Sequence, residues 1–183
     1  MLELKNISKY YNPGSVNEMC LFQDFNLTIR DHEFVSVVGS NGSGKTSLLN
    51  IICGSIGVDS GNIIVNGTDI TGKKDFLRQR KIGRVYQDPS KGTCSSMNIL
   101  ENMSLADNKG KGYGLTKGVN KARIEEYRES LKQLNLGLED KLYTKVGSLS
   151  GGQRQALTLL MATLKKPKLL LLDEHTAALD PKT

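Results

Sequence analysis

A glycine-rich loop between an apolar run and a helical pattern is the feature that most constrains the fold of this chain. Residues 39–46 read Gly-Ser-Asn-Gly-Ser-Gly-Lys-Thr and follow an apolar run at residues 34–38. The continuous apolar run predicts a buried central strand. Residues 46–53 have a helical pattern that stops at Gly54. A strand, a glycine-rich loop and a helix in this order predict an α/β fold with a phosphate site at the start of the helix.

The loop carries the residue types that bind ATP together with magnesium. Its glycines let backbone N–H groups curl around phosphates. Lys45 places a cation against the β- and γ-phosphate oxygens, and the Thr46 hydroxyl can ligate magnesium. A chance glycine turn is the alternative interpretation. The apolar strand before the loop and the helix after it favour a nucleotide site.

Acidic and amide side chains follow two further predicted strands. Four leucines at residues 169–172 lead directly to Asp173 and Glu174. Because ligands bind at the carboxyl edge of an open sheet, we expect Asp173 to hold magnesium and Glu174 to polarise the attacking water. Gln87 follows a predicted strand at residues 82–86, where its amide can reach the same magnesium and water. Taken alone, each of these residues could lie in a solvated turn. The phosphate loop earlier in the chain is what favours a role in nucleotide binding.

A second anion site is predicted at residues 149–153, which read Leu-Ser-Gly-Gly-Gln. Ser150, Gly151 and Gly152 come immediately before the apolar pattern of residues 153–164, so a hydroxyl and bare N–H groups lie at a helix N-terminus. A plain serine N-cap is the alternative interpretation. One chain cannot easily bring this site to its own phosphate loop. The sequence therefore predicts ATP held between two subunits.

The rest of the chain predicts an antiparallel sheet and a separate helical segment. Alternating apolar residues at positions 2–4 and 25–29 indicate two antiparallel strands, and residues 61–67 indicate another. Beyond Ser90 a Gly- and Lys-rich loop leads to an amphipathic helix, for which Gly137 is the expected C-terminal stop. Four apolar residues lie on one face of that helix: Ile124, Tyr127, Leu131 and Leu134.

Composition argues against several classes of function. The formal charge of +6 could suggest nucleic acid, but the basic residues are scattered and lack an aromatic-interleaved stripe. Cys20, Cys53 and Cys94 have no metal-ligand spacing, which favours reduced thiols in a cytosolic protein. No apolar run approaches the ~18 residues that span a bilayer. Any membrane association is therefore expected to come through a partner.

Together the motifs resemble those of the nucleotide-binding subunits of ATP-binding cassette (ABC) transporters, and the resemblance covers essentially the whole chain. In order along the chain, they resemble the Walker A loop (residues 39–46), the Q-loop (Gln87), the signature motif (residues 149–153), the Walker B strand (residues 169–173), the catalytic glutamate (Glu174) and the D-loop (residues 178–180). Residues 8–12 resemble the segment in which the family stacks an aromatic ring on adenine, and Tyr11 is preferred to Tyr10 for that role.

The resemblance implies a site for ATP and Mg²⁺. The catalytic residues it implies are Glu174, Gln87 and Lys45, and the metal-binding residues are Thr46, Gln87 and Asp173. The nucleotide-binding residues it implies are Tyr11, Gly39, Ser40, Asn41, Gly42, Ser43, Gly44, Lys45, Thr46, Ser47, Ser150, Gly151, Gly152, Gln153 and Asp180.

The resemblance also implies a P-loop NTPase core with a mixed, mainly parallel sheet, an antiparallel β subdomain and an ABC-type α-helical subdomain. Within a single ABC ATPase domain at residues 1–183, residues 1–89 and 165–183 would form the core. Residues 90–164, with the signature motif, would form the helical subdomain. His175 stands where many members have proline. The family's switch histidine lies beyond Thr183, so we expect the C-terminal end of the core to be missing and hydrolysis by this chain alone to be slow.

As a function, the resemblance implies an ATPase subunit that powers solute transport by head-to-tail dimerisation with itself or a paired ABC subunit. Its implied partners are an integral membrane permease, docked near the Gln87 loop, and a solute-binding protein, with no direct nucleic acid partner. The implied location is the cytoplasmic face of the cell membrane. Residues 97–105, residues 109–118 and the run from 136–140 through 175–180 resemble a bacterial subgroup of uptake systems, with aromatic amino acids among the candidate cargoes.

Other ATPase classes are the alternative, in particular a soluble ABC-type ATPase that acts on ribosomes or nucleic acid. DNA-repair and chromosome-organising ATPases separate their halves by a very long coiled coil, whereas only ~100 residues without a heptad pattern separate Lys45 from Leu149. Translation-factor ATPases carry two cassettes, and one is seen here. Glu174 and Gln87 argue against a non-enzymatic ATP-binding regulator. A P-loop kinase would need an acceptor-binding lid where residues 149–153 stand.

Overall fold

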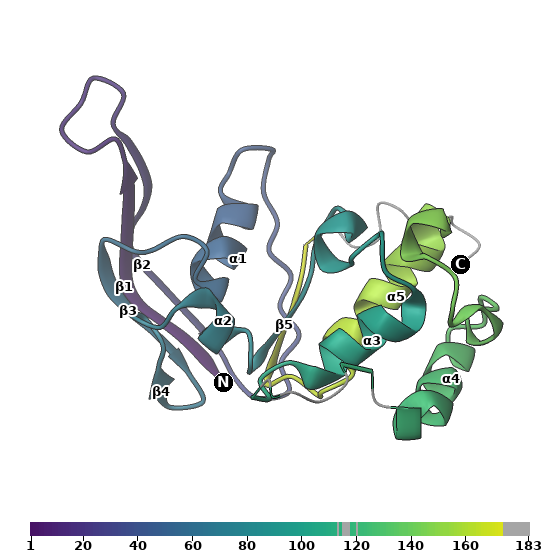
Figure 1. Ribbon diagram of the computed structural model, residues 1–183. Helices are drawn as coiled ribbons and strands as arrows, with labels where there is room; N and C mark the ends of the chain where they lie inside the picture. Colours follow the sequence, from purple (N-terminus) through teal and green to yellow (C-terminus); the bar gives the residue numbers. More distant parts are fainter. Residues whose placement is uncertain (113, 115–117, 120, 174–183) are drawn as a thin grey trace. The chain divides into compact units, whose positions relative to one another are not determined.

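The computed structural model describes residues 1–112, 114, 118–119 and 121–173. Two compact units make up the chain (Figure 1), Met1–Ile82 and Gly83–Thr183. Each unit has strands and helices of its own, and each carries a different part of the predicted site. The predicted subdivision into a core and a helical subdomain remains a prediction.

An antiparallel sheet forms one side of the first unit. Its strands are β1 (Leu2–Tyr11), β2 (Met19–Ile29), β3 (Ser60–Val65) and β4 (Thr68–Asp69), in the order β2-β1-β3-β4. Leu4 of β1 pairs with Leu27 of β2 on one side and with Ile63 of β3 on the other. Buried apolar residues of β1 and β3 alternate with more accessible ones: Glu3 lies between Leu2 and Leu4, and Ile64 lies between Ile63 and Val65. The two predicted antiparallel strands are therefore confirmed.

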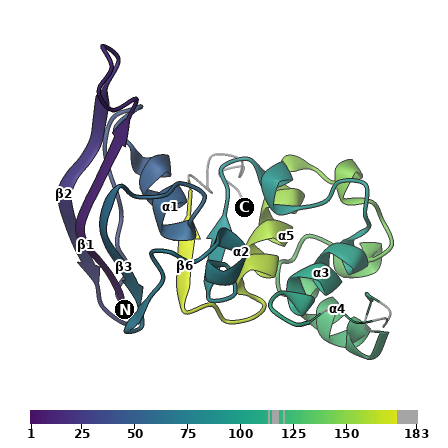
Figure 2. The ribbon, with the colours of Figure 1, turned by 60° about the vertical axis from the view of Figure 1, so that its left-hand side comes forward.

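Helix α1 (Lys45–Cys53) follows the phosphate loop, as the sequence predicts, and lies beside the sheet in Figures 1 and 2. Gly54 ends the helix in a left-handed conformation, and its N–H donates to the Asn50 and Ile51 carbonyls. This is the usual role of glycine at a helix C-terminus. Leu48, Ile51 and Ile52 are buried and anchor the helix in the core of the unit. The short helix α2 (Asp75–Arg78) completes the unit.

The apolar run at residues 34–38 differs from the prediction. These residues have no regular secondary structure, and the relative exposures of Phe34 and Val38 are 88% and 87%. The described strands pair within two sheets, β2-β1-β3-β4 and β5-β6, and this run belongs to neither. An apolar sequence forms a central strand only when strands on both sides supply hydrogen bonds and packing. The prediction of a central strand here is therefore wrong for the described structure.

The other sheet is made of β5 (Ile82–Val85) and β6 (Leu169–Leu172), and all of it except Ile82 belongs to the second unit. The Asp173 N–H donates to the Val85 carbonyl at 3.1 Å, so the carboxyl ends of the two strands lie together and the strands run parallel. Gln87 and Asp173 thus follow neighbouring strands at one edge of a sheet. This confirms the placement that the sequence predicts for these two residues.

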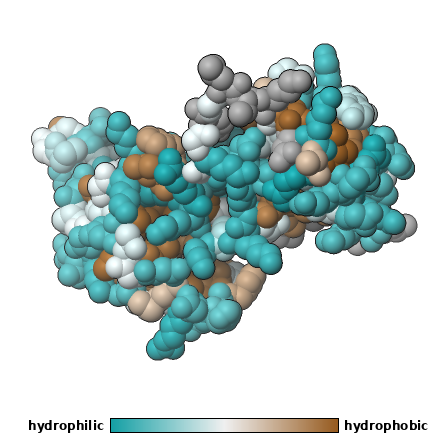
Figure 3. All heavy atoms as spheres, turned by 60° about the horizontal axis from the view of Figure 1, so that its bottom comes forward, coloured by the Kyte–Doolittle hydropathy of each residue, from teal (hydrophilic) through white to brown (hydrophobic). Residues whose placement is uncertain are grey.

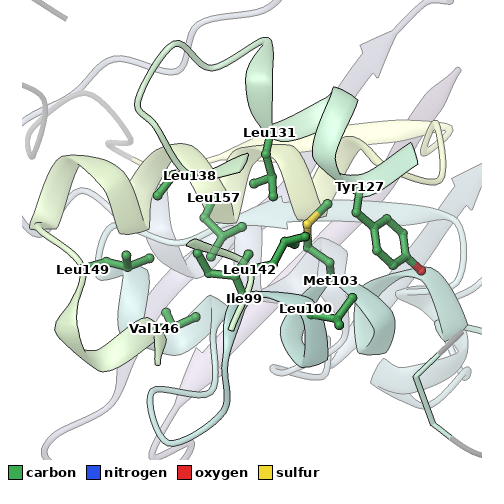
Figure 4. Packing of buried hydrophobic residues seen from close by; sticks show 10 residues of the cluster. All are labelled: Ile99, Leu100, Met103, Tyr127, Leu131, Leu138, Leu142, Val146, Leu149 and Leu157. Carbon is green, nitrogen blue, oxygen red and sulfur yellow. The ribbon is translucent and has the colours of Figure 1, made fainter. Parts of the chain in front are cut away.

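Three helices pack around a hydrophobic core in the second unit (Figure 4). They are α3 (Ile99–Asn108), α4 (Ile124–Lys132) and α5 (Gly151–Thr163). The 3₁₀ turn η1 (Pro89–Gly92) precedes α3, and the turns η2 (Lys121–Arg123), η3 (Glu139–Lys141) and η4 (Val146–Ser148) lie between the helices. Tyr127 and Leu131 are completely buried, which confirms the predicted apolar face of α4. Leu157 of α5 packs into the same core.

The C-terminal end of α4 corrects a second prediction. The helix ends at Lys132, before the expected stop at Gly137. Asn135 already has a φ of 53°, and Gly137 has a φ of 64°. Asparagine is among the few residues other than glycine that adopt the left-handed conformation, so the chain turns before it reaches Gly137.

Hydrophilic side chains cover much of the face shown in Figure 3. Among the helices of the described residues, none is both long enough and apolar enough to cross a membrane.

Candidate functional site

The backbone of the phosphate loop depends on its glycines. Gly42 and Gly44 have φ values of 83° and 89°, which L side chains rarely adopt. A Cβ added at Gly44 would lie 3.0 Å from Leu21 Cδ1, and one at Gly39 would lie 2.6 Å from Ser43 Oγ. Gly44 is also the N-cap of α1. The loop conformation, the close approach of β2 and the start of the helix therefore all depend on the absence of side chains.

The Lys45 side chain folds back over the loop. Its Nζ donates to the Gly39 carbonyl at 2.8 Å and to the Ser40 carbonyl at 2.9 Å. Residues 39–43 and Thr46 are exposed to solvent. The N-terminal end of a helix attracts anions because its first N–H groups point outwards. The loop therefore presents a cation, backbone donors and a hydroxyl on one accessible surface, which suits a polyphosphate.

Tyr11, the candidate for adenine stacking, is the last residue of β1. It is half-buried and pairs with Met19 of β2. Lys9 Nζ lies 5.7 Å from the centroid of the Tyr11 ring. Tyr10 is the neighbouring residue on the strand, and successive side chains of a strand point to opposite faces. Burial, and then the nearby Cys20 thiol, raise the pKa of Tyr10. The two tyrosines thus have different surroundings, and Tyr11 is the one with a cation over its ring.

Asp173, the candidate magnesium ligand, lies in the second unit just after β6. Its side chain is 9% exposed, and its Oδ2 lies 3.3 Å from Arg84 Nη2 on β5. The Arg84 guanidinium also lies 4.5 Å from the centroid of the Tyr86 ring. A buried carboxylate needs a partner of opposite charge, and Arg84 provides it. Gln87 is exposed directly after Tyr86.

The predicted second anion site begins helix α5. Ser150 is its N-cap: Ser150 Oγ accepts from the Gln153 N–H at 3.2 Å, and Gln153 Oε1 accepts from the Ser150 N–H at 3.2 Å. This reciprocal pair is a capping box. Ser150 and Gly151 are exposed, and a Cβ at Gly151 would meet nothing within 4 Å. The serine cap of the alternative interpretation is present, and the same helix end is also open to an anion from outside.

Two of the predicted metal ligands are oxygen donors, one in each unit. Among the described residues, no cluster of three or more His, Cys, Asp or Glu side chains could hold a metal by itself. Thr46 offers one hydroxyl and Asp173 one carboxylate, and both are hard oxygen ligands. Magnesium is commonly held by one or two such protein ligands together with phosphate oxygens. Glu174 and Asp180, also predicted for the site, lie outside the described residues.

Three charged residues that lie beside predicted site residues or their neighbours were not predicted from the sequence: Arg84, Lys9 and Asp59. Arg84 did carry a signal, because an arginine between apolar residues of a strand is rarely buried without a partner. Lys9 and Asp59 carried none, since they are fifty residues apart and Asp59 resembles any acid before a turn.

The chain matches a family model described as ABC transporter over residues 22–177. It is 50% identical over 185 residues to the tyrosine transport ATP-binding protein of Clostridioides difficile (strain R20291), covering all of this chain and 72% of that protein. It is 37% identical to a spermidine/putrescine import ATP-binding protein of Pasteurella multocida (strain Pm70), again along its whole length but over 45% of that protein. This chain therefore spans less than half of the second relative.

The structure is similar to that of a dimeric ATP-binding cassette solved in a post-hydrolysis state with ADP and Pi. The TM-score is 0.82 at 32% sequence identity, and the match covers all of this chain and 77% of that one. The predicted mixed α/β fold, with an antiparallel and a parallel sheet, is confirmed by this similarity.

Proposed function

Because the chain belongs to the ABC transporter family of ATPases, we propose that it binds and hydrolyses ATP to drive import of a solute through a membrane permease. The geometry of the phosphate loop is the observation that carries this proposal. Gly42 and Gly44 hold the loop in a left-handed shape, and Lys45 lies across it at the start of α1. These features suit the triphosphate of a nucleotide.

The proposed roles of the remaining residues follow from their chemistry. Thr46 and Asp173 would hold magnesium, with the Gln87 amide near the metal and the attacking water. Magnesium, when bound, neutralises charge on the β- and γ-phosphates. Glu174 would accept the proton of the water, because a carboxylate is a suitable general base. Lys45 would stay on the phosphate oxygens throughout, since it is anchored on the first turn of α1.

A shared site between two chains is proposed for the Ser150 end of α5. The Ser150 hydroxyl accepts a hydrogen bond from the Gln153 N–H, and it still has a proton to donate to a phosphate oxygen. The dimeric solved relative with ADP and Pi supports such an arrangement. Asp180 would lie at the same interface. Loss of the γ-phosphate would remove an anion bridging two positive helix ends, so hydrolysis would reopen the dimer.

Import of an amino acid is the proposed transport function. The relative at 50% identity is named for tyrosine transport, and others are named for the import of spermidine and putrescine, phosphonates or methionine. Aromatic amino acids are therefore the first cargoes to test. The proposed partners are an integral membrane permease and a solute-binding protein, with this chain at the cytoplasmic face of the membrane and its helical subdomain at residues 90–164 facing the permease.

ATP binding by Lys45→Ala tests the site directly. We expect the wild-type chain to bind MgATP in equilibrium titration and Lys45→Ala to lose at least tenfold in affinity, because it removes the phosphate cation. Lys141→Met, which removes an exposed cation elsewhere, serves as the control and should bind normally. Equal affinity of wild type and Lys45→Ala would reject the site assignment.

Uptake tests the transport assignment. The chain would be co-expressed with candidate amino-acid permeases, and radiolabelled tyrosine uptake would be compared between wild type and Glu174→Gln. Uptake that requires Glu174 supports the proposal. ATP binding together with ribosome co-sedimentation, and no permease association, would favour the soluble ATPase instead.

A further inference from the structure

Asp59 ties together the end of the strand that carries Tyr11. It directly precedes β3, and its Oδ1 accepts from Lys9 Nζ at 3.0 Å while its Oδ2 accepts from the Tyr10 N–H at 2.7 Å. The Asp59 N–H in turn donates to the Ser8 carbonyl at 2.9 Å. One residue therefore bonds to three consecutive residues of β1, immediately before Tyr11.

These bonds stand where regular sheet pairing stops. The pairing of β1 with β3 ends at Ser8 and Ser60. On its other side, β1 pairs with β2 through register shifts between Ile7 and Lys9 and between Lys9 and Tyr10. The last residues of β1 thus have an irregular ladder on one side and no β3 partner on the other. The Asp59 carboxylate supplies the hydrogen bond that a neighbouring strand would otherwise provide.

Lys9 joins this contact to the Tyr11 ring. Lys9 and Tyr11 are two residues apart on β1, and Lys9 Nζ lies 5.7 Å from the ring centroid, within the range of a cation–π interaction. The Lys9 side chain is 17% exposed, and the ion pair with Asp59 sets the position of its ammonium. A cation over one face of a ring leaves the other face for a flat ligand.

We propose that Asp59 and Lys9 are positioning residues for the base of the nucleotide: Asp59 fixes Lys9, Lys9 covers one face of the Tyr11 ring, and adenine stacks on the other. This inference rests on the proposed role of Tyr11 in ATP binding. The hydrogen bonds from the Tyr10 N–H and from Lys9 lower the pKa of Asp59, so its carboxylate is charged at neutral pH. The contact therefore operates under the conditions in which ATP is bound.

Comparison of ATP with inorganic tripolyphosphate tests the proposal, because only ATP has a base. Affinities of both, with magnesium, would be measured calorimetrically for wild type, Asp59→Asn, Lys9→Met and Tyr11→Leu. We expect Asp59→Asn and Lys9→Met to lower the affinity for ATP about 3- to 10-fold, comparable to a lost stacking interaction. Their affinity for tripolyphosphate should not change. Asp140→Asn and Lys141→Met remove the same charges at exposed positions in the other unit and should change neither affinity.

The variants separate the possible outcomes. If Asp59→Asn and Lys9→Met lower both affinities equally, their role is structural and the proposal is overturned. If Tyr11→Leu weakens ATP binding while the other two bind ATP normally, Tyr11 is the platform but the positioning role is wrong. If Tyr11→Leu binds ATP normally, the platform itself is wrong, whereas failure of the wild type to bind either ligand would reject the proposed function. Thermal unfolding of each variant identifies any loss of folding, and Lys9→Met keeps the bond between Asp59 and Tyr10 if Asp59→Asn does not fold.

Discussion

In each predicted motif, one side chain forms hydrogen bonds or an ion pair with nearby groups of the protein. Lys45 bonds to the carbonyls of its own loop, Arg84 pairs with Asp173, and Ser150 bonds to Gln153. In each case a polar group that a nucleotide or metal could contact already has a partner in the protein. Binding must therefore exchange one favourable contact for another, so net affinities will be smaller than the contacts suggest.

Gly44→Ala is the sharpest prediction at this scale. Its φ of 89° and the 3.0 Å approach of Leu21 both oppose a Cβ, so we expect a loss of about 1–3 kcal/mol in the free energy of unfolding together with weaker ATP binding. Urea denaturation and ATP titration would measure both. Gly72→Ala is the matched control, because Gly72 lacks a positive φ and a Cβ there meets nothing within 4 Å. A loss no larger than that of Gly72→Ala would contradict the account.

Two helices illustrate how elements are fixed from outside. Arg78, 4% exposed, closes the C-terminal end of α1: its Nη1 donates to the Ile51 carbonyl at 2.9 Å and to the Ile52 carbonyl at 3.3 Å. Its Nη2 donates to the Thr71 carbonyl at 2.6 Å. Cationic donors suit the last carbonyls of a helix. The helix that begins with the phosphate loop is thus anchored at its far end by a residue outside it.

Replacing Arg78 by methionine should therefore loosen α1. We expect a loss of about 2–4 kcal/mol, because several buried carbonyls lose a charged donor at once. Chemical denaturation measures the loss, and amide hydrogen exchange should show its effect in residues 45–53. Arg80→Met, which removes an exposed arginine two residues away, should change stability by less than about 0.5 kcal/mol. Similar stabilities of the two variants would show that Arg78 does not anchor the helix.

In the second unit, the buried carboxylate of Asp107 fixes two helices relative to each other. The carboxylate is 3% exposed at the end of α3; it pairs with Arg123, lies 3.6 Å from Lys111 Nζ and accepts from the Tyr127 hydroxyl at 3.2 Å. Burial by itself would raise the pKa of Asp107, but the bond and charge of Arg123, with Lys111 and Tyr127, outweigh burial and lower it. The carboxylate therefore links α3 to the beginning of α4.

A lowered carboxyl pKa predicts how stability depends on pH. The contribution of Asp107 is fully present above the pKa that the carboxyl has in the unfolded chain, and it is lost as the pH falls below that value and through the lower pKa of the folded state. We expect Asp107→Asn to be less stable by about 1–3 kcal/mol at pH 7 and to lose less stability than wild type on acidification. Urea midpoints at pH 7, 5 and 3 measure this. Parallel curves for the two proteins would refute it.

Local signals made most elements predictable. The helix from Lys45, its glycine stop and the Ser150 cap could be predicted because each depends on residues within a few positions. Arg84 with Asp173 and Lys9 with Asp59 could not, since their partners are 89 and 50 positions apart. Residues 34–38 show the converse: the sequence favours a strand, but strand formation depends on partners that local pattern does not specify.

At the scale of the whole molecule, the predicted assembly is the decisive property. We expect Glu174→Gln to bind ATP and form a dimer, because an amide occupies the same space but cannot accept the proton of water. Light scattering after size exclusion, with and without ATP, measures the mass. Adding Ser150→Arg should abolish the dimer but leave ATP binding intact. A monomeric Glu174→Gln chain saturated with ATP would contradict ATP-driven closure in this chain.

The capping box of α5 has a consequence for the speed of such a cycle. Ser150 and Gln153 close the first turn of the helix by themselves, so the surface offered to a second chain is already ordered before contact. Two folded chains would then associate without a change in this helix end, so the association rate would be limited by diffusion and orientation rather than by coil-to-helix folding. When the dimer opens after hydrolysis, the first turn of α5 would stay folded and could bind the next partner without refolding.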